Sequence, residues 1–124
     1  MKKLTSMVVA FGLGSALFLA GCSSTESKVS DGVNEMIETT GQLSKAIDKG
    51  DQAKVKEVGP KLEDQWSSFE DDVKKDNKDL YEKIEKYLDP TIAGSEADTL
   101  DKDALSTLND QLTDALKELA DKTK

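Results

Sequence analysis

The chain has no histidine, no arginine and a single cysteine, Cys22, among its 124 residues. Without histidine there is no imidazole base for catalysis and no imidazole ligand for a metal. One cysteine forms neither a disulfide framework nor a thiolate zinc site. Lysine supplies all 17 basic residues against 25 acidic ones, and such an acidic chain is a poor ligand for a phosphate backbone. We therefore expect a protein that is not an enzyme, holds no cofactor and binds no nucleic acid.

Aromatic side chains are also scarce, at 5% of the residues, and no segment alternates apolar and polar residues as a half-buried strand does. Charged residues make up 34% of the chain and hydrophobic residues 36%. The hydrophobic residues recur at helical spacing, which disfavours wholesale disorder. The length allows one domain of ordinary size. These observations predict a single all-α domain.

The N-terminal region has the pattern of a removable targeting segment. Lys2 and Lys3 form a positive start, and an uncharged apolar run follows from Met7 to Ala20. The run has the length of a signal-peptide core and is short for a membrane-spanning helix, which needs about 20 apolar residues.

The apolar run ends in a four-residue motif, Leu19-Ala20-Gly21-Cys22. This motif resembles the bacterial lipobox, where the chain is cleaved before a cysteine that has received a diacylglyceryl group. The resemblance implies that residues 1–21 are a lipoprotein signal peptide and that the mature chain begins at a lipidated Cys22. Two alternatives are an ordinary signal peptide with an incidental cysteine and an uncleaved anchor.

A diacylglyceryl group supplies two acyl chains of the palmitate kind, which is the number that stable membrane anchoring needs. Residues 22–28 are short, polar and predicted to be a flexible tether. Loss of Lys2 and Lys3 with the signal peptide changes the net charge from −8 to about −10. We expect a membrane lipoprotein on the outer face of the bacterial membrane, exposed at the cell surface, with a protein partner.

From residue 29 onward, apolar residues recur at steps of three and four, which predicts helices over approximately 29–49, 51–74, 77–90 and 101–121. Four helices with short links favour an antiparallel up-down bundle. We expect residues 29–121 to form this bundle and residues 122–124 to fray. The residues expected on the inner faces are Val29, Val33, Met36, Thr40, Leu43, Ile47, Val55, Val58, Leu62, Trp66, Phe69, Val73, Leu80, Tyr81, Ile84, Tyr87, Leu88, Ala104, Leu105, Leu108, Leu112, Ala115, Leu116 and Leu119.

Local signals set the expected helix ends. Gly50 is suited to a left-handed cap and Asp51 to the start of the next helix. Pro60 is expected to kink the second helix because it removes a backbone donor. The segment 91–99 contains a glycine and a serine and is predicted to be a loop. An alternative joins the second and third helices into one.

Two features of the helices could carry chemistry. Trp66 and Phe69 lie one turn apart among core positions, so we expect them in the core, with an aromatic recognition patch as the alternative. Carboxylates cluster over residues 63–72 and 79–89. Hard cations prefer such oxygen ligands, but lysines are interleaved with them, and a solvated charged surface is the expected interpretation.

A longer pattern extends over residues 43–120. It resembles the extracytoplasmic helical domain that precedes the membrane part of bacterial high-affinity iron permeases, and helical domains of lipoproteins linked to iron uptake. The matching residues are Gly50-Asp51-x-Ala53-Lys54, Leu62-x-x-x-Trp66-x-x-Phe69-Glu70-x-x-Val73, Leu80-Tyr81-x-x-Ile84-Glu85-x-x-Leu88, Asp103-Ala104-Leu105 and Leu108-x-x-x-Leu112-x-x-x-Leu116.

The chain departs from this pattern in two ways. It lacks the Arg-Glu-x-x-Glu motif of the permeases and the histidine-containing metal motif of the related lipoproteins. The resemblance therefore implies an accessory role in iron uptake and not transport. The only glutamates that match are Glu70 and Glu85, each beside a core aromatic or aliphatic residue, which makes them weak candidates for metal ligands. The alternative function is a structural lipoprotein that docks a protein or cell-wall partner and has no metal role.

Overall fold

A computed structural model describes the backbone of residues 9–123 and the side chains of residues 27–123. The described residues form helices and no strand, so the predicted all-α class is confirmed. Within them, no helix has an apolar stretch that is long enough to cross a membrane. The helices are α1 (Val9–Lys49), α2 (Gln52–Val58), α3 (Lys61–Ser67), α4 (Glu70–Asp76), α5 (Lys78–Glu96) and α6 (Lys102–Lys122).

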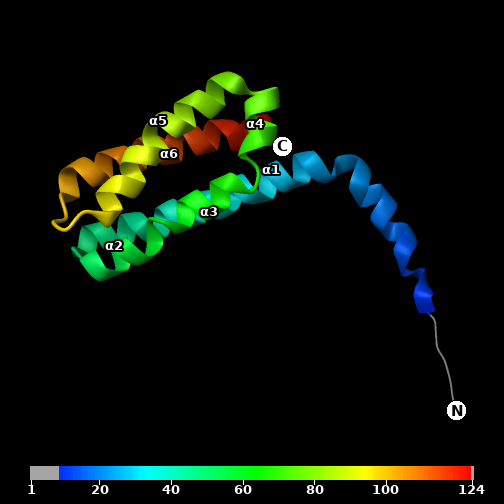
Figure 1. The fold of residues 1–124 in the computed structure, drawn as a ribbon, viewed down its shortest axis with the longest axis horizontal. Helices are drawn as coiled ribbons and strands as arrows, with labels where there is room; N and C mark the ends of the chain where they lie inside the picture. Colours follow the sequence, from blue (N-terminus) through cyan, green and yellow to red (C-terminus); the bar gives the residue numbers. More distant parts are fainter. Residues whose placement is uncertain (1–8, 124) are drawn as a thin grey trace, which may run out of the picture.

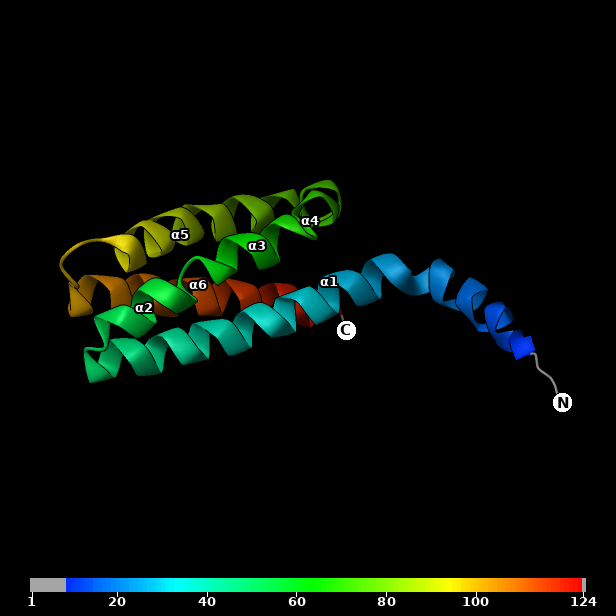
Figure 2. The same cartoon turned by 60° about the horizontal axis from the view of Figure 1, so that its bottom comes forward.

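Helices α5, α6 and the later part of α1 lie along one common direction, whereas α4 crosses it at one end and the first part of α1 turns away from it (Figures 1 and 2). The short helices α2, α3 and α4 follow one another, and each of them packs between α1 and α5. Helix α6 also packs against both α1 and α5, on their other side. The first part of α1 extends beyond the other helices in both views. Residues 22–28, the expected flexible tether, lie within α1.

Several helix ends follow the expected local chemistry. Gly50 has a φ of +66°, the left-handed conformation that glycine adopts without strain. Asp51 caps α2 by accepting a hydrogen bond from the Lys54 backbone N–H at 3.1 Å. Asp101 caps α6 in the same way through the Ala104 N–H, also at 3.1 Å. Asn77 precedes α5 but makes no side-chain capping bond.

The predicted helix 51–74 is wrong as a single kinked helix. Gly59 and Pro60 separate α2 from α3, and a second break at Ser68 and Phe69 separates α3 from α4. Phe69 has a φ of −138° and a ψ of 2°, outside the helical region. The alternative of a continuous second and third helix is also wrong, because Asn77 leaves the helical conformation and the chain reverses there (Figure 1).

The predicted loop over residues 91–99 is also wrong, because α5 continues through Pro90 to Glu96. The hydroxyl groups of Thr91 and Ser95 form hydrogen bonds within this helix. Thr91 Oγ1 donates to the Tyr87 carbonyl at 2.6 Å, and Ser95 Oγ donates to the Ile92 carbonyl at 2.7 Å. Both side chains are buried. Small residues occur in this segment because α5 packs closely there.

Two glycines permit that kind of close packing. A Cβ at Gly59 would lie 1.8 Å from Ser95 Oγ, so the junction between α2 and α3 lies against α5. A Cβ at Gly32 would lie 2.4 Å from Cδ1 of Phe69. Neither side chain could be added without displacing a neighbour, which explains why glycine occupies both positions.

The core follows most of the predicted inner faces. Trp66 and Phe69 are each 1% exposed, so they belong to the core and do not form a surface patch. Ala104 is exposed and Leu108 is only half-buried, whereas Leu105 between them is buried as predicted. Asn109 was not predicted inside, yet it is buried and its Nδ2 donates to the Thr40 carbonyl at 2.9 Å.

Candidate functional site

The densest group of chemically distinctive side chains surrounds Trp66 on α3. The indole ring stacks on Tyr81 of α5, with ring centroids 5.8 Å apart and an angle of 24° between the planes. Phe69 meets the same indole edge-on, at 5.3 Å and 81°. These geometries are the two that aromatic pairs prefer. The three rings join α3, the α3–α4 junction and α5.

Glu85 of α5 accepts a hydrogen bond from Trp66 Nε1 at 2.6 Å. The indole is buried, whereas Glu85 is half-buried. A buried N–H without a partner costs free energy, so the carboxylate allows the indole to enter the core. A hydrogen bond to a charged acceptor is also stronger than a neutral one. Glu85 therefore stabilises the fold as the hydrogen-bond acceptor of the buried indole, which its charge alone did not indicate.

Glu70 at the start of α4 belongs to the same group. Partial burial raises the pKa of Glu70, and the nearby charges of Glu85, Asp71 and Glu63 raise it further, while Lys74 acts in the opposite direction. The negative charge of Glu85 on α5 thus acts on Glu70 on α4. We call Trp66, Phe69, Glu70, Tyr81 and Glu85 the Trp66 cluster.

Tyr81 responds to the same carboxylates. Desolvation raises the pKa of its hydroxyl, and Glu85, Glu70, Asp71 and Asp89 raise it further. Lys74 Nζ lies 5.4 Å from the Tyr81 ring centroid, within the range of a cation–π contact. The Trp66 cluster is therefore negatively charged at its surface and aromatic beneath it.

The Trp66 cluster does not have the ligands of a metal centre. Among residues whose side chains are described, no group of three or more carboxylate, thiol or imidazole side chains is arranged to hold a metal ion. The predicted candidates Glu70 and Glu85 come together as a pair, and Glu85 already accepts the indole hydrogen bond.

An acidic hollow of about 480 Å³ lies at the edge of α3 and α5. Pro60, Ile92 and Ala93 supply its apolar surface. Four carboxylates surround it, and two of these residues, Glu63 and Asp89, also act on the pKa values of the Trp66 cluster. The four are Glu63, Asp64, Asp89 and Glu96. The hollow extends the negative surface beyond the Trp66 cluster.

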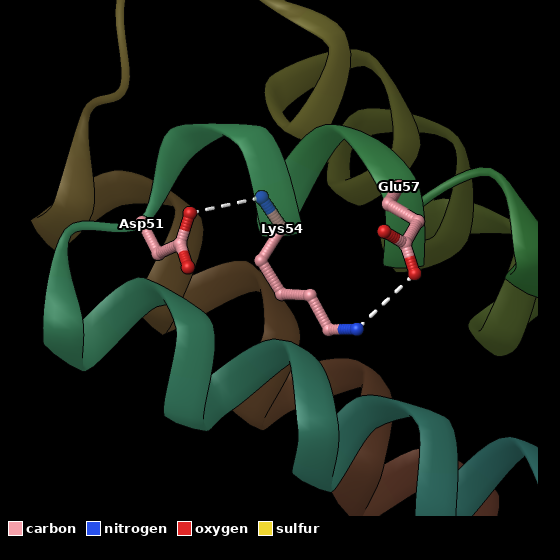
Figure 3. Close-up of polar contacts among 3 residues, drawn as sticks. All are labelled: Asp51, Lys54 and Glu57. Atoms are coloured by element: carbon pink, nitrogen blue, oxygen red, sulfur yellow. Dashed lines mark hydrogen bonds and ion pairs between the residues drawn. The ribbon is translucent and has the colours of Figure 1, made fainter.

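A surface of opposite charge lies at the turn between α1 and α2. An open pocket of about 490 Å³ is lined there by Lys45, Lys49 and Lys54, together with Gln42, Ala46 and Asp51. Figure 3 shows the local contacts: Asp51 is held by the Lys54 backbone, and Lys54 Nζ lies 3.1 Å from Glu57 Oε1. We call Lys45, Lys49 and Lys54 the lysine corner. The sequence alone did not predict it, because the three lysines come from two helices.

Cys22 lies in the helical backbone of α1, but its side chain is outside the described residues. The predicted positive start at Lys2 and Lys3 also lies outside them. Lipidation of Cys22 therefore stays a prediction from the sequence motif. Sequence reasoning also missed two polar packing contacts, that of Asn109 with Thr40 and that of Gln65, whose Nε2 donates to Thr39 Oγ1 at 2.9 Å. A polar residue at an inner position gives no signal of its own.

Comparison with known proteins gives one relationship. The chain is 31% identical over 102 residues to a Bacillus subtilis (strain 168) protein named iron uptake system component EfeM. The alignment covers 82% of this chain and 26% of that protein, so the chain spans about a quarter of its relative's length. No family model matches the chain, and no solved structure matches it. The sequence is thus related to that of a component of an iron-uptake system.

Proposed function

We propose that this protein is a lipid-anchored accessory component of an iron-uptake system on the outer face of a bacterial membrane. The observation that carries the proposal is the 31% identity to the iron uptake component, which extends over 82% of this chain. The lipobox motif that ends in Cys22 supports the anchor. The relative is much longer, so this chain corresponds to one part of it, and we infer that it assists other components.

We infer that the accessory role works through protein contact. Among the described side chains no group of three or more is arranged to hold a metal ion, and the carboxylate of Glu85 is engaged with the Trp66 indole. Helices α1 and α5 both pack against α6, and both also pack against the consecutive short helices α2, α3 and α4. This arrangement supports an antiparallel up-down bundle in which α2–α4 together take the place of one helix. Such a bundle is a rigid body with two ends and several charged faces. We also infer that it has no enzymatic activity.

The proposal is tested by measuring uptake of radioactive iron under iron limitation in a strain that lacks the gene. We expect uptake to fall several-fold and to be restored by the wild-type gene. The variant Cys22→Ser removes the thiol that takes the lipid, and we expect it to be unprocessed or released from the membrane and to restore little uptake. A mature-sized Cys22→Ser protein that stays in the membrane fraction would contradict the anchor.

A second candidate function is a structural lipoprotein that docks a protein or cell-wall partner without any role in iron uptake. The lack of a metal-binding group among the described side chains favours it. The same deletion strain separates the two functions. Wild-type iron uptake in that strain, together with a stable stoichiometric partner in crosslinking, would support the structural role and exclude the iron-uptake role.

A further inference from the structure

We propose that the lysine corner is a docking site for an acidic segment of a partner protein. Lys45, Lys49 and Lys54 surround one open pocket of about 490 Å³. The net charge of the whole chain is −8, so a pocket lined by three lysines and one acid is an exception on this surface. The inference rests on the charges at this surface and does not depend on the role in iron uptake.

The lysines are mostly free of internal partners. Lys54 pairs with Glu57 at 3.1 Å, and both side chains are about half exposed. Within the described part of the chain, neither Lys45 nor Lys49 has an ion pair or a hydrogen bond through its side chain. Asp51 is the only acid that lines the pocket, and its carboxylate is occupied in capping α2. With the charges of Asp51 and Glu57 counted against the three lysines, a net charge of about +1 remains at the pocket.

Fold stability explains only part of this arrangement. Lys49 lies in the last turn of α1, where a cation is favourable. Lys45 lies four residues earlier on the same helix, and like charges at that spacing destabilise a helix. Lys54 enters from α2, across the turn at Gly50. Three lysines from two helices therefore line one pocket, and an anionic partner would complement their charge.

The strength of exposed ion pairs indicates which kind of anion can bind at the lysine corner. One exposed ion pair changes a binding constant only a few-fold, so three of them hold a small anion no more tightly than about 1 mM. A useful ligand must therefore present several carboxylates at once and add contacts around them. An extended polyanion is disfavoured, because the rest of this acidic surface would repel it. A short acidic protein segment satisfies both conditions.

The position of the lysine corner suits such a partner. The turn between α1 and α2 lies at the end of the bundle opposite to the side from which α1 enters (Figures 1 and 2). The loop between α5 and α6 ends beside it, where Gln52 Nε2 donates to the Asp98 carbonyl and Lys102 Nζ donates to the Asp48 carbonyl at 3.1 Å. These contacts fix the backbone around the pocket. A partner would meet an ordered surface there.

The test uses the full chain in a non-ionic detergent with fluorescein-labelled octaglutamate as the probe. Fluorescence anisotropy gives the dissociation constant, and amide chemical shifts locate the peptide. We expect binding at low salt, shifts centred on residues 42–54, and roughly tenfold weaker binding by the variant Lys45→Gln, Lys49→Gln, Lys54→Gln. Binding should also weaken as salt rises, because the lysines are exposed.

The matched control is Lys61→Gln, Lys75→Gln, Lys117→Gln, which removes the same charge from three exposed lysines on α3, α4 and α6. It should bind the peptide like the wild type. Equal weakening in the control, or no binding at low salt, would overturn the proposal. Binding of linear polyphosphate without binding of octaglutamate would overturn the assignment to a protein segment. Dimerisation that only the lysine-corner variant abolishes would assign the surface to a second copy of this chain and overturn the separate partner.

Discussion

Helix α6 and the three consecutive helices α2, α3 and α4, which we call the α2–α4 arm, are similar in length but are built differently. Helix α6 continues for 21 residues, with leucines on one side and an aspartate cap. The α2–α4 arm consists of three helices of seven residues each, and α3 and α4 have no side-chain cap. Isolated helices of seven residues are unstable in water. The comparison teaches that local sequence signals suffice for α6, whereas the α2–α4 arm depends on what it packs against.

This difference predicts how the two regions open. Amides of α6 should exchange with solvent as slowly as the most protected part of the molecule, because their hydrogen bonds are broken only with the core. Amides of α2 and α4 should exchange faster, since short helices can open locally.

The largest effect is expected from Trp66→Ala in the α2–α4 arm. The indole is 1% exposed and contacts Phe69 and Tyr81. Its loss should destabilise the protein by about 3–5 kcal/mol, measured by urea denaturation. The control Trp66→Phe keeps an aromatic ring but removes the donor to Glu85, and it should cost less. A melting temperature for Trp66→Ala within a degree or two of the wild type would contradict the dependence of this arm on packing.

A smaller effect is expected from Gly59→Ala at the α2–α3 junction. The added Cβ would lie 1.8 Å from Ser95 Oγ, so α5 or the junction must move. We expect a loss of about 1–3 kcal/mol in the free energy of unfolding. Gly41→Ala is the matched control, because no atom lies within 4 Å of its Cβ position in α1. That substitution should stabilise the protein by up to about 1 kcal/mol, since alanine is the better helix former. Equal changes in the free energy of unfolding for Gly59→Ala and Gly41→Ala would show that the α2–α3 junction has room for a methyl group.

The smallest effect concerns pH and the start of α4. The pKa of Glu70 is raised in the folded protein by partial burial and by Glu85. The folded state therefore binds this proton more tightly than the unfolded state does, and stability falls as pH rises through the interval above the ordinary value of 4.5. Glu70→Gln should be more stable than the wild type at pH 7, by less than about 1 kcal/mol because the group is partly exposed. The difference should vanish near pH 3 in parallel denaturation curves. A variant that is less stable at pH 7 would contradict the repulsion.

The same contrast explains what the sequence could predict. The inner faces of α1 and α6 follow from the spacing of Val33, Met36, Leu112 and Leu116, and the caps at Asp51 and Asp101 follow from local chemistry. The continuation of α5 past Pro90 could not be predicted, because Thr91 and Ser95 become buried only when another helix covers them.

The candidate site shows the same limit. The resemblance singled out Glu70 and Glu85, and in the structure partial burial and then the charge of Glu85 raise the pKa of Glu70. The sequence did not indicate that Glu85 accepts a hydrogen bond from Trp66, 19 residues away in the chain. Such a partner depends on how α3 and α5 are placed. The resemblance therefore singled out the residues of the Trp66 cluster, but the sequence did not indicate the role of each one.

The unbroken course of α1 has a mechanical consequence. A helix rises about 1.5 Å per residue, so the distance along α1 from Cys22 to Lys49 is about 40 Å. With the proposed lipids on Cys22, α1 would act as a rod that carries the lysine corner at a limited height above the bilayer. A partner in the same membrane would then meet it by diffusion in two dimensions, at a local concentration far above that in bulk solution. Weak exposed ion pairs would be sufficient for recognition under that confinement.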